Sequence, residues 1–261
     1  MKLASPPAVL ALAGLEPAGK AGLIADAFTI RELGGEPLAI ATALTAQGPG
    51  RFGVYRVPPN VVSKQIRALT EQFSLRAVKL GMVPDSRVLR AIRAELGRHQ
   101  VPWVVDPVVR TSRGQALSVL RPKDYLALAS PRVLLTPNAL EAGWLLGRRK
   151  PVRRLEEALE AGTRLVRQGF AAVVVKGGHL QPTGTDLLCL PDAVLYLRGR
   201  KLGRSPSRHR GTGCRFASAL ATELAKGASI PNAALQAKQF VERFLRSGRP
   251  SGAKRTPRRR R

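Results

Sequence analysis

The chain has 261 residues, and its 44 lysines and arginines against 17 acidic residues give a formal net charge of +27. A chain of this length can bury a sizeable core, as one large α/β domain or two small ones. No apolar run approaches the length of a membrane-spanning helix, and two cysteines, Cys189 and Cys214, are too few for a disulfide framework. The composition therefore excludes a membrane span and a disulfide-stabilised domain, and it predicts a cytoplasmic protein.

The basic excess predicts affinity for polyanions such as nucleotides, nucleic acids or anionic surfaces. Residues 247–261 hold seven positive charges and no acid, so subtracting 7 from +27 leaves +20 on the rest of the chain. The alternative explanation is a general arginine bias with solvated arginine faces. There is no zinc-ligand spacing, and seven Phe, three Tyr and two Trp are few for a base-stacking platform. Nucleic-acid contact through the basic surface is left open and is not favoured.

Strands and helices alternate along the first half of the chain. The first apolar run, residues 7–14, predicts a strand buried on both faces of a parallel sheet. It is short, has one preceding positive charge and leads directly into a glycine-containing loop, so a signal peptide is the weaker interpretation. The apolar periodicity then predicts helices over residues 21–33, 58–73 and 85–96, and strands over 38–46, 77–82 and 101–105.

The second half continues the alternation and then changes. Strands are expected over 133–135 and 172–176 and helices from Asn138 and over 154–167, followed by an antiparallel hairpin of residues 185–190 and 193–197. A helix from Gly211 to Gly227 and a last helix over 231–246 complete a single domain, residues 1–246, before a basic disordered tail, 247–261. This order predicts a doubly wound α/β sheet, in which ligands bind beyond the carboxyl ends of the strands.

The glycine-rich stretch Gly211-Thr212-Gly213-Cys214 opens an apolar, alanine-rich helix. A glycine turn before a helix presents backbone N–H groups beside the positive end of the helix dipole, which favours an anion. Cys214 falls in the first turn, where the dipole is expected to lower the pKa of its thiol. The alternative is a tight loop before a core helix, with Cys214 as a small buried apolar residue.

Polar residues follow several of the predicted strands, where a ligand is expected. They are Gln47, Asp106, Asn138 with Glu141 one turn into its helix, and Lys176. Each has a structural alternative: a turn residue for Gln47, a strand-end cap for Asp106, a helix capping box for Asn138 with Glu141, and a solvated strand end for Lys176.

These motifs occur together in the order and spacing of the ribokinase-like kinases. Within them the chain resembles the hydroxymethylpyrimidine and phosphomethylpyrimidine kinases of thiamine biosynthesis, from about Val9 to about Phe244. The motifs of that branch are residues 43–47 (Ala-Leu-Thr-Ala-Gln), 78–82 (Val-Lys-Leu-Gly-Met), 105–108 (Val-Asp-Pro-Val), 135–138 (Leu-Thr-Pro-Asn), 175–179 (Val-Lys-Gly-Gly-His) and the cysteine of 211–214. The resemblance implies a ribokinase-like doubly wound, mostly parallel sheet flanked by helices, and ATP-dependent phosphorylation of 4-amino-5-hydroxymethyl-2-methylpyrimidine, with its monophosphate as a further substrate.

The resemblance also implies a role for each site residue. Gly211, Thr212 and Gly213 form an anion hole for the γ-phosphate, and Cys214 takes the proton of the substrate hydroxymethyl group. Lys176, Asn138 and Asp106 bind the nucleotide. Glu141, less directly helped by Asp106 and Asn138, holds Mg²⁺ through waters. Gln47 reads the aminopyrimidine edge, and Asp26, Gly14 and Met82 complete the substrate site. A homodimer is left open, since family members often dimerise through the sheet.

The chain departs from the family mainly on the substrate side. The first loop has Leu15, Glu16 and Lys20 where the family has a hydroxyl residue, an aspartate and a glycine. Arg210 replaces the histidine before Gly-Thr-Gly, with His209 one place earlier, and Arg215 replaces a small residue and could clamp a phosphoryl group. Residues 112–114 read Ser-Arg-Gly for Lys-Ser-Gly, and the basic tail replaces a His-rich segment. Two alternatives follow: specificity shifted toward pyridoxal-type alcohols, or a non-catalytic paralogue that binds a ligand or polyanion.

Overall fold

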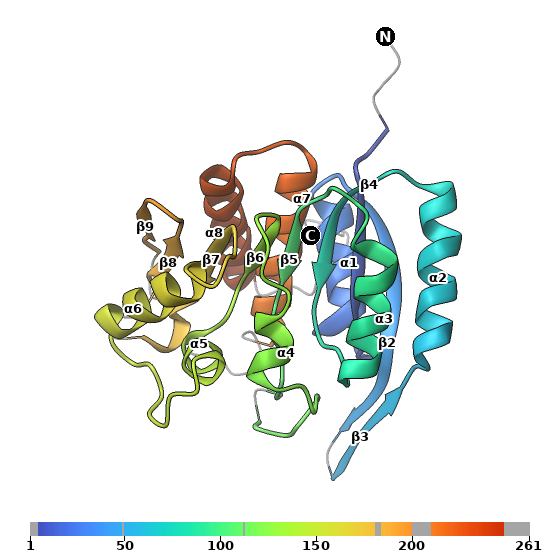
Figure 1. The fold of residues 1–261 in the computed structure, drawn as a ribbon, viewed down its shortest axis with the longest axis horizontal. Coiled ribbons are helices and arrows are strands. Elements are labelled where there is room, and N and C mark those ends of the chain that lie inside the picture. The colour runs from blue at the N-terminus through green and yellow to red at the C-terminus, as the bar shows by residue number, and fades with distance from the viewer. Residues whose placement is uncertain (1–4, 49, 112, 181–183, 200–209, 248–261) are drawn as a thin grey trace, which may run out of the picture.

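The computed structural model of the protein describes residues 5–48, 50–111, 113–180, 184–199 and 210–247. One nine-stranded sheet runs through the molecule in the order β3-β2-β1-β4-β5-β6-β7-β8-β9 (Figure 1). The expected tail lies almost wholly outside the described residues. No helix in the described part of the chain is both long and apolar enough to cross a membrane.

The middle of the sheet is parallel and both of its ends are antiparallel. Neighbouring strands from β2 through β1, β4, β5 and β6 to β7 pair in parallel. The pairs β2–β3, β7–β8 and β8–β9 are antiparallel. The strand bounds are β1 Ala8–Leu15, β2 Glu36–Gly48, β3 Arg51–Arg56, β4 Leu75–Leu80, β5 Trp103–Val105, β6 Val133–Leu135, β7 Ala172–Val175, β8 Asp186–Cys189 and β9 Val194–Leu197. The expected mostly parallel sheet and the late hairpin, now β8 and β9, are confirmed.

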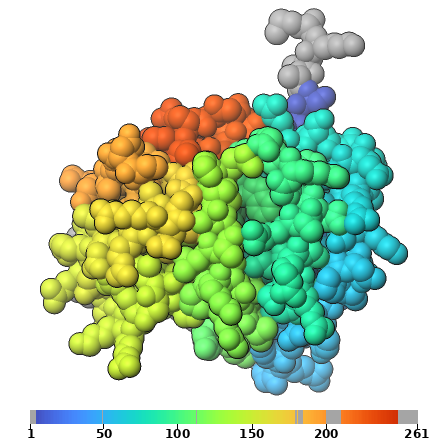
Figure 2. Space-filling model, in the orientation of Figure 1, coloured from blue at the N-terminus to red at the C-terminus, as the bar shows by residue number. Residues whose placement is uncertain are grey.

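Helices cover both faces of the sheet (Figure 1). One face packs against α1 (Gly22–Glu32), α7 (Thr212–Ala225) and α8 (Ile230–Ser247). The other face packs against α2 (Pro59–Gln72), α3 (Ser86–Leu96), α4 (Pro122–Leu126), α5 (Ala139–Leu145) and α6 (Leu155–Val166). Figure 2 shows this face of the molecule, where the side chains of the second set lie over the middle of the sheet. A short 3₁₀ turn, η1 (Gly177–His179), follows β7.

Strand β1 lies at the centre because its sequence can be buried on both sides. Six consecutive residues from Ala8 to Ala13 are buried, as expected for a parallel strand covered by helices on both faces. The chain passes from β1 to β2 on one side and later to β4 on the other. The order of the strands therefore reverses at β1, and such a switch point opens a crevice at the carboxyl ends of the strands.

Two elements were not expected from the sequence. Strand β3 pairs with the end of β2 in an antiparallel hairpin, with Leu44 opposite Tyr55 and Gln47 opposite Phe52. The expected strand 38–46 is thus longer, and Gln47 lies within β2 rather than in a turn after it. Helix α4 was also missed because it has only five residues, too few to show helical periodicity. The hairpin projects beyond the layers of the sandwich (Figure 1).

Candidate active site

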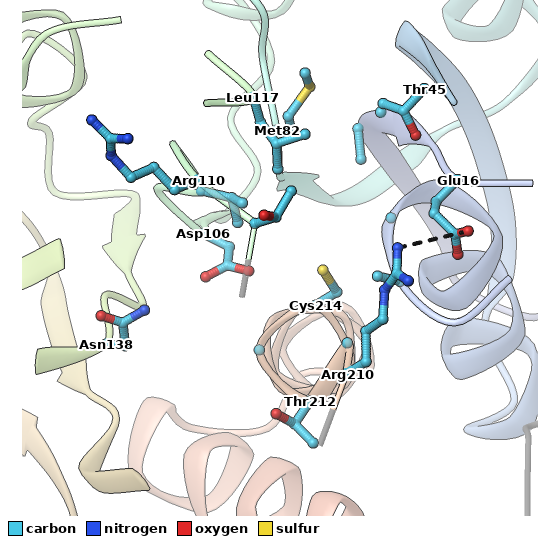
Figure 3. Close-up of a pocket in the computed structure, with 18 of the residues that line it drawn as sticks. Glu16, Thr45, Met82, Asp106, Arg110, Leu117, Asn138, Arg210, Thr212 and Cys214 are labelled. Carbon is cyan, nitrogen blue, oxygen red and sulfur yellow. Dashed lines mark ion pairs between the residues drawn. The ribbon is translucent and has the colours of Figure 1, made fainter. Parts of the chain in front are cut away.

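A cavity of about 200 Å³ opens at the carboxyl ends of the parallel strands, beside the switch point. Figure 3 looks into it: Cys214 lies at the end of α7, with Asp106, Asn138 and Met82 around it. All the predicted site residues except Asp26 line this cavity, namely Gly14, Gln47, Met82, Asp106, Asn138, Glu141, Lys176, Gly211, Thr212, Gly213 and Cys214. The folding of the chain thus brings together residues that are up to 200 positions apart, since Gly14 and Cys214 line the same space.

The N-terminus of α7 forms one wall of the cavity. Its cap, Gly211, has a left-handed backbone with φ of 77°, and a Cβ there would lie 2.1 Å from the carbonyl oxygen of Lys20. Only glycine can adopt this conformation without strain at so close an approach. The turn places the positive end of the helix dipole at the cavity, and the binding of an anion there stays a prediction.

Lys176 and Asp106 form an ion pair directly above this helix end. The Lys176 Nζ donates to Asp106 Oδ1 at 2.7 Å, and the Asp106 side chain is almost fully buried. Burial disfavours the ammonium, but the carboxylates of Asp106 and Glu141 outweigh it and raise the pKa of Lys176. A Cβ on Gly213 would lie 3.1 Å from the Lys176 Nζ, so this glycine gives the pair its room.

Asn138 and Glu141 form the capping box that the sequence offered as an alternative. The Asn138 side chain accepts from the Glu141 N–H at 2.9 Å, and the Glu141 carboxylate accepts from the Asn138 N–H at 2.8 Å. Both side chains also line the cavity, so the capping role and a ligand role are compatible. Burial, opposed by Lys176, raises the pKa of Glu141 to about 7.

Cys214 differs from its expected state. Its thiol lines the cavity and is half-buried, but burial raises its pKa above the ordinary value, and the nearby Lys79 only partly opposes this. The prediction that the helix dipole would lower the pKa of Cys214 is therefore wrong, because desolvation of the thiolate is the larger effect.

Asp26 lies behind the cavity wall rather than in it. Its fully buried carboxylate accepts from the Lys79 Nζ at 2.6 Å and from the Ser218 hydroxyl at 2.9 Å. The expectation that Asp26 orients a substrate ring directly is corrected by this placement, since the carboxylate is already used by two donors. The residue that reaches the cavity is Lys79, which the sequence reasoning did not assign to the site. A lysine inside an otherwise apolar strand was the available signal.

The first loop supplies a second unassigned residue, Glu16. Its carboxylate accepts from the backbone N–H groups of Ala18 and Lys20 at 3.1 and 2.9 Å, which holds the loop in shape. Arg210 reaches toward it from the other side of the cavity, with 3.8 Å between Arg210 Nη2 and Glu16 Oε1 (Figure 3). Arg210 also donates to the side-chain oxygen of Gln47 at 2.6 Å. His209 lies outside the described residues.

Arg215 points away from the cavity. Its guanidinium donates to the carbonyl oxygen of Lys20 at 3.0 Å and stacks 4.1 Å from the centre of the Phe244 ring. Burial lowers the pKa of this side chain. The expectation that Arg215 could clamp a phosphoryl group is wrong, because the side chain instead joins the first loop to α8.

The donor set allows only indirect metal binding. Among the residues described, no group of three or more His, Cys, Asp or Glu side chains could hold a metal ion by itself. Three carboxylates of the described residues line the cavity. Among the ion pairs found in the described part, Asp106 pairs with Lys176 and Glu16 pairs with Arg210, whereas Glu141 belongs to none. This arrangement fits a hydrated Mg²⁺ shared with phosphate oxygens, the mode in which magnesium keeps several waters.

A doubly wound α/β sheet with a helix N-terminus, a lysine–aspartate pair and a thiol around one cavity defines a ribokinase-like kinase. The chain belongs to the phosphomethylpyrimidine kinase family, whose profile matches residues 16–259.

Individual proteins agree with this assignment. The hydroxymethylpyrimidine/phosphomethylpyrimidine kinase of Streptomyces coelicolor is 34% identical over 252 residues, which cover 95% of this chain and 92% of that protein. Among solved structures, the ADP complex of Bacillus subtilis pyridoxal kinase has a TM-score of 0.79 at 27% identity and covers 90% of each chain. The phosphomethylpyrimidine kinase of Clostridium difficile 630 has a TM-score of 0.76 at 27% identity, covering 92% of this chain and 99% of that one.

Proposed function

We propose that this kinase transfers the γ-phosphoryl group of ATP to the hydroxymethyl oxygen of 4-amino-5-hydroxymethyl-2-methylpyrimidine, and then to the resulting monophosphate. The observation that supports it most is the cavity in which Cys214, the α7 N-terminus and the Lys176–Asp106 pair converge. About 200 Å³ suits one small ring rather than a drug-sized ligand. The names of the relatives point to the same acceptor.

The residues of the cavity divide the reaction between them. The substrate oxygen attacks the γ-phosphorus, the bond from that phosphorus to the bridging oxygen breaks, and ADP leaves. The N-terminus of α7 and Lys176 stabilise the charge on the transferred group, which is the main demand of phosphoryl transfer. Cys214 accepts the proton of the hydroxymethyl group. Only the thiolate can accept this proton, so the Cys214 thiol first loses its own proton to solvent. Burial raises the pKa of that thiol, which makes the thiolate scarcer but a stronger base, and the nearby Lys79 ammonium partly opposes the rise.

Glu141, with Asp106 and Asn138 beside it, would hold Mg²⁺ through waters, and the ion would neutralise phosphate charge. We place the reaction in the cytoplasm, which agrees with two cysteines that are both free. The homodimer remains a prediction, and so does the single domain of residues 1–246.

A second acceptor is favoured by one observation, the TM-score of 0.79 with Bacillus subtilis pyridoxal kinase. Pyridoxal also presents a hydroxymethyl group on a six-membered nitrogen ring, so the same machinery could act on it. We place it second because the matching family is that of the phosphomethylpyrimidine kinases.

The test is the formation of ADP by the purified protein with Mg-ATP and each acceptor: the pyrimidine alcohol, its monophosphate and pyridoxal. Cys214→Ala should lower kcat by about 10²-fold or more, as loss of a general base does. Cys189→Ala is the matched control, because Cys189 is buried in β8 and does not line the cavity. Absence of turnover on all three acceptors would reject the kinase assignment in favour of a non-catalytic binding protein.

A further inference from the structure

Four groups at the substrate end of the cavity form one continuous chain of hydrogen bonds. The Arg210 guanidinium donates to Gln47 Oε1 at 2.6 Å, and Gln47 Nε2 donates to Thr45 Oγ1 at 3.1 Å. The Thr45 hydroxyl then donates to the carbonyl oxygen of Leu15 at 3.1 Å. Arg210, Gln47 and Thr45 all line the cavity.

The direction of this chain is fixed at both ends. The guanidinium of Arg210 can only donate hydrogen bonds, and the carbonyl oxygen of Leu15 can only accept them, so the donor and the acceptor at the two ends of the chain cannot exchange roles. The orientation of a glutamine amide is otherwise ambiguous, because its oxygen and nitrogen can exchange places. Here the oxygen of Gln47 must face Arg210 and its nitrogen must face Thr45.

Arg210 is itself held in place. Its Nη2 lies 3.8 Å from the Glu16 carboxylate, and that carboxylate is fixed by the N–H groups of Ala18 and Lys20 (Figure 3). The arginine is therefore anchored by the first loop on one side while it contacts Gln47 on the other.

We propose that Arg210 is a specificity-determining residue, because it fixes the order in which Gln47 offers hydrogen bonds to a ring in the cavity. This inference rests on the proposed function, in which the acceptor ring lies against Gln47. After its bonds to Arg210 and Thr45, the amide has one N–H and one oxygen lone pair left for a ligand, in a fixed order.

The fixed order selects one class of ring. A 4-aminopyrimidine presents a ring-nitrogen acceptor beside an amino donor, which matches the remaining N–H and lone pair of Gln47. The corresponding 4-oxopyrimidine presents a ring N–H beside a carbonyl oxygen. Its ring N–H would face the Gln47 lone pair, which otherwise accepts from an amino group, only if Gln47 reversed its amide. In the fixed order, the ring N–H meets the N–H of Gln47 and the ring carbonyl meets the Gln47 oxygen. Reversing the amide to suit the oxo ring would turn its NH₂ group toward the Arg210 donor, so Arg210 resists that reversal.

The experiment compares the binding of 4-amino-5-hydroxymethyl-2-methylpyrimidine with that of its 4-oxo analogue by titration calorimetry, for the full chain and for Arg210→Met. We expect the unmodified protein to prefer the amino ring by about 100-fold, the size of a bidentate discrimination. In Arg210→Met the reversed amide loses only its bond to Thr45, so the preference should fall below about 10-fold. Arg110→Met is the matched control, because Arg110 lines the same cavity but donates to the Gly114 carbonyl oxygen instead of Gln47.

The outcomes separate this inference from the proposed function. An Arg110→Met protein that keeps the preference, beside an Arg210→Met protein that loses it, supports the role of Arg210. An unchanged preference in Arg210→Met overturns that role and leaves the proposed function intact, as does equal binding of both rings by the unmodified protein. Failure of the unmodified protein to bind the amino ring overturns both. Thermal unfolding of each variant checks that the fold is retained.

Discussion

At the scale of single residues, the least expected feature is an ion pair between two fully buried side chains, Lys79 and Asp26. Removing two charges from water costs several kcal/mol each, and their attraction offsets this only in good geometry with further hydrogen bonds. Ser218 supplies one such bond to Asp26. Lys79 lines the cavity and Asp26 lies behind its wall, so a change in either partner reaches the site.

We expect Lys79→Met to destabilise the protein by about 3–5 kcal/mol, because it leaves the Asp26 carboxylate buried without its cation. The double variant Lys79→Met with Asp26→Leu should recover most of that loss, since no unpaired charge then remains. Urea denaturation of the three proteins measures this. A double variant as unstable as the single one would show that the packing of Lys79, and not its charge, is what the fold requires.

The sequence could not assign this pair, for a physical reason. Lys79 interrupts the apolar run of residues 77–82, which marks the position but does not identify its partner. Asp26 is 53 positions away in α1, and only the packing of α1 and α7 beside β4 brings the two together. By contrast, Gln47, Asp106, Asn138 and Lys176 could be placed at the cavity from the strand-end rule alone.

At the scale of elements, the first turn of α7 is fitted closely to the strands opposite it. Gly211 is required by its backbone conformation, whereas a Cβ on Gly213 would only crowd the end of the Lys176 side chain, 3.1 Å from its Nζ. These two glycines therefore have different reasons to be present, and substitutions at them should fail in different ways.

Gly213→Ala should impair activity more than stability. Alanine favours the helix, and the extra methyl group would press on the Lys176–Asp106 pair from 3.1 Å. The Lys176 Nζ would have to move by a few tenths of an ångström, so the loss in kcat/KM should stay below the about 10²-fold that a 1 Å misplacement costs. Steady-state kinetics and thermal unfolding, with Gly227→Ala at the other end of the helix as the control, measure the two effects. Since Gly227 has φ of 92°, its variant should lose stability instead of activity.

The elements were predictable in proportion to their length and regularity. Long amphipathic helices such as α2 and α3 begin and end within about two residues of their expected bounds, and Asp85, the first residue of the expected range, caps α3. Strand β3 was missed because Arg51, Phe52, Tyr55 and Arg56 are exposed and show no buried face. Its pairing with β2 is a contact between two strands, which apolar periodicity within one strand does not report.

At the scale of the whole molecule, the main unexplained quantity is the charge of +27. Only 11 ion pairs are found among the described residues, so most of the basic side chains have no acidic partner there. A field of this sign attracts polyanions in a salt-dependent way, whatever the reaction in the cavity.

Replacing the seven basic residues of positions 248–261 by glutamine should weaken binding to heparin and reduce its salt dependence, because fewer counterions are released. The kcat should stay unchanged, since the cavity is lined by residues between Ala13 and Cys214. Elution from a heparin column and ADP formation measure the two effects. Unchanged elution would assign the polyanion affinity to the rest of the chain.

The place of α7 in the chain has a consequence for synthesis. This helix packs against the central strands β1, β4 and β5, yet all three are made more than 100 residues earlier. Until α7 leaves the ribosome, the apolar face of those strands that carries Val9, Ala77 and Val104 lacks its cover. Between the synthesis of β5 and that of α7 the nascent chain therefore lacks the cover of this apolar face, and the same late helix that completes the core also completes the site.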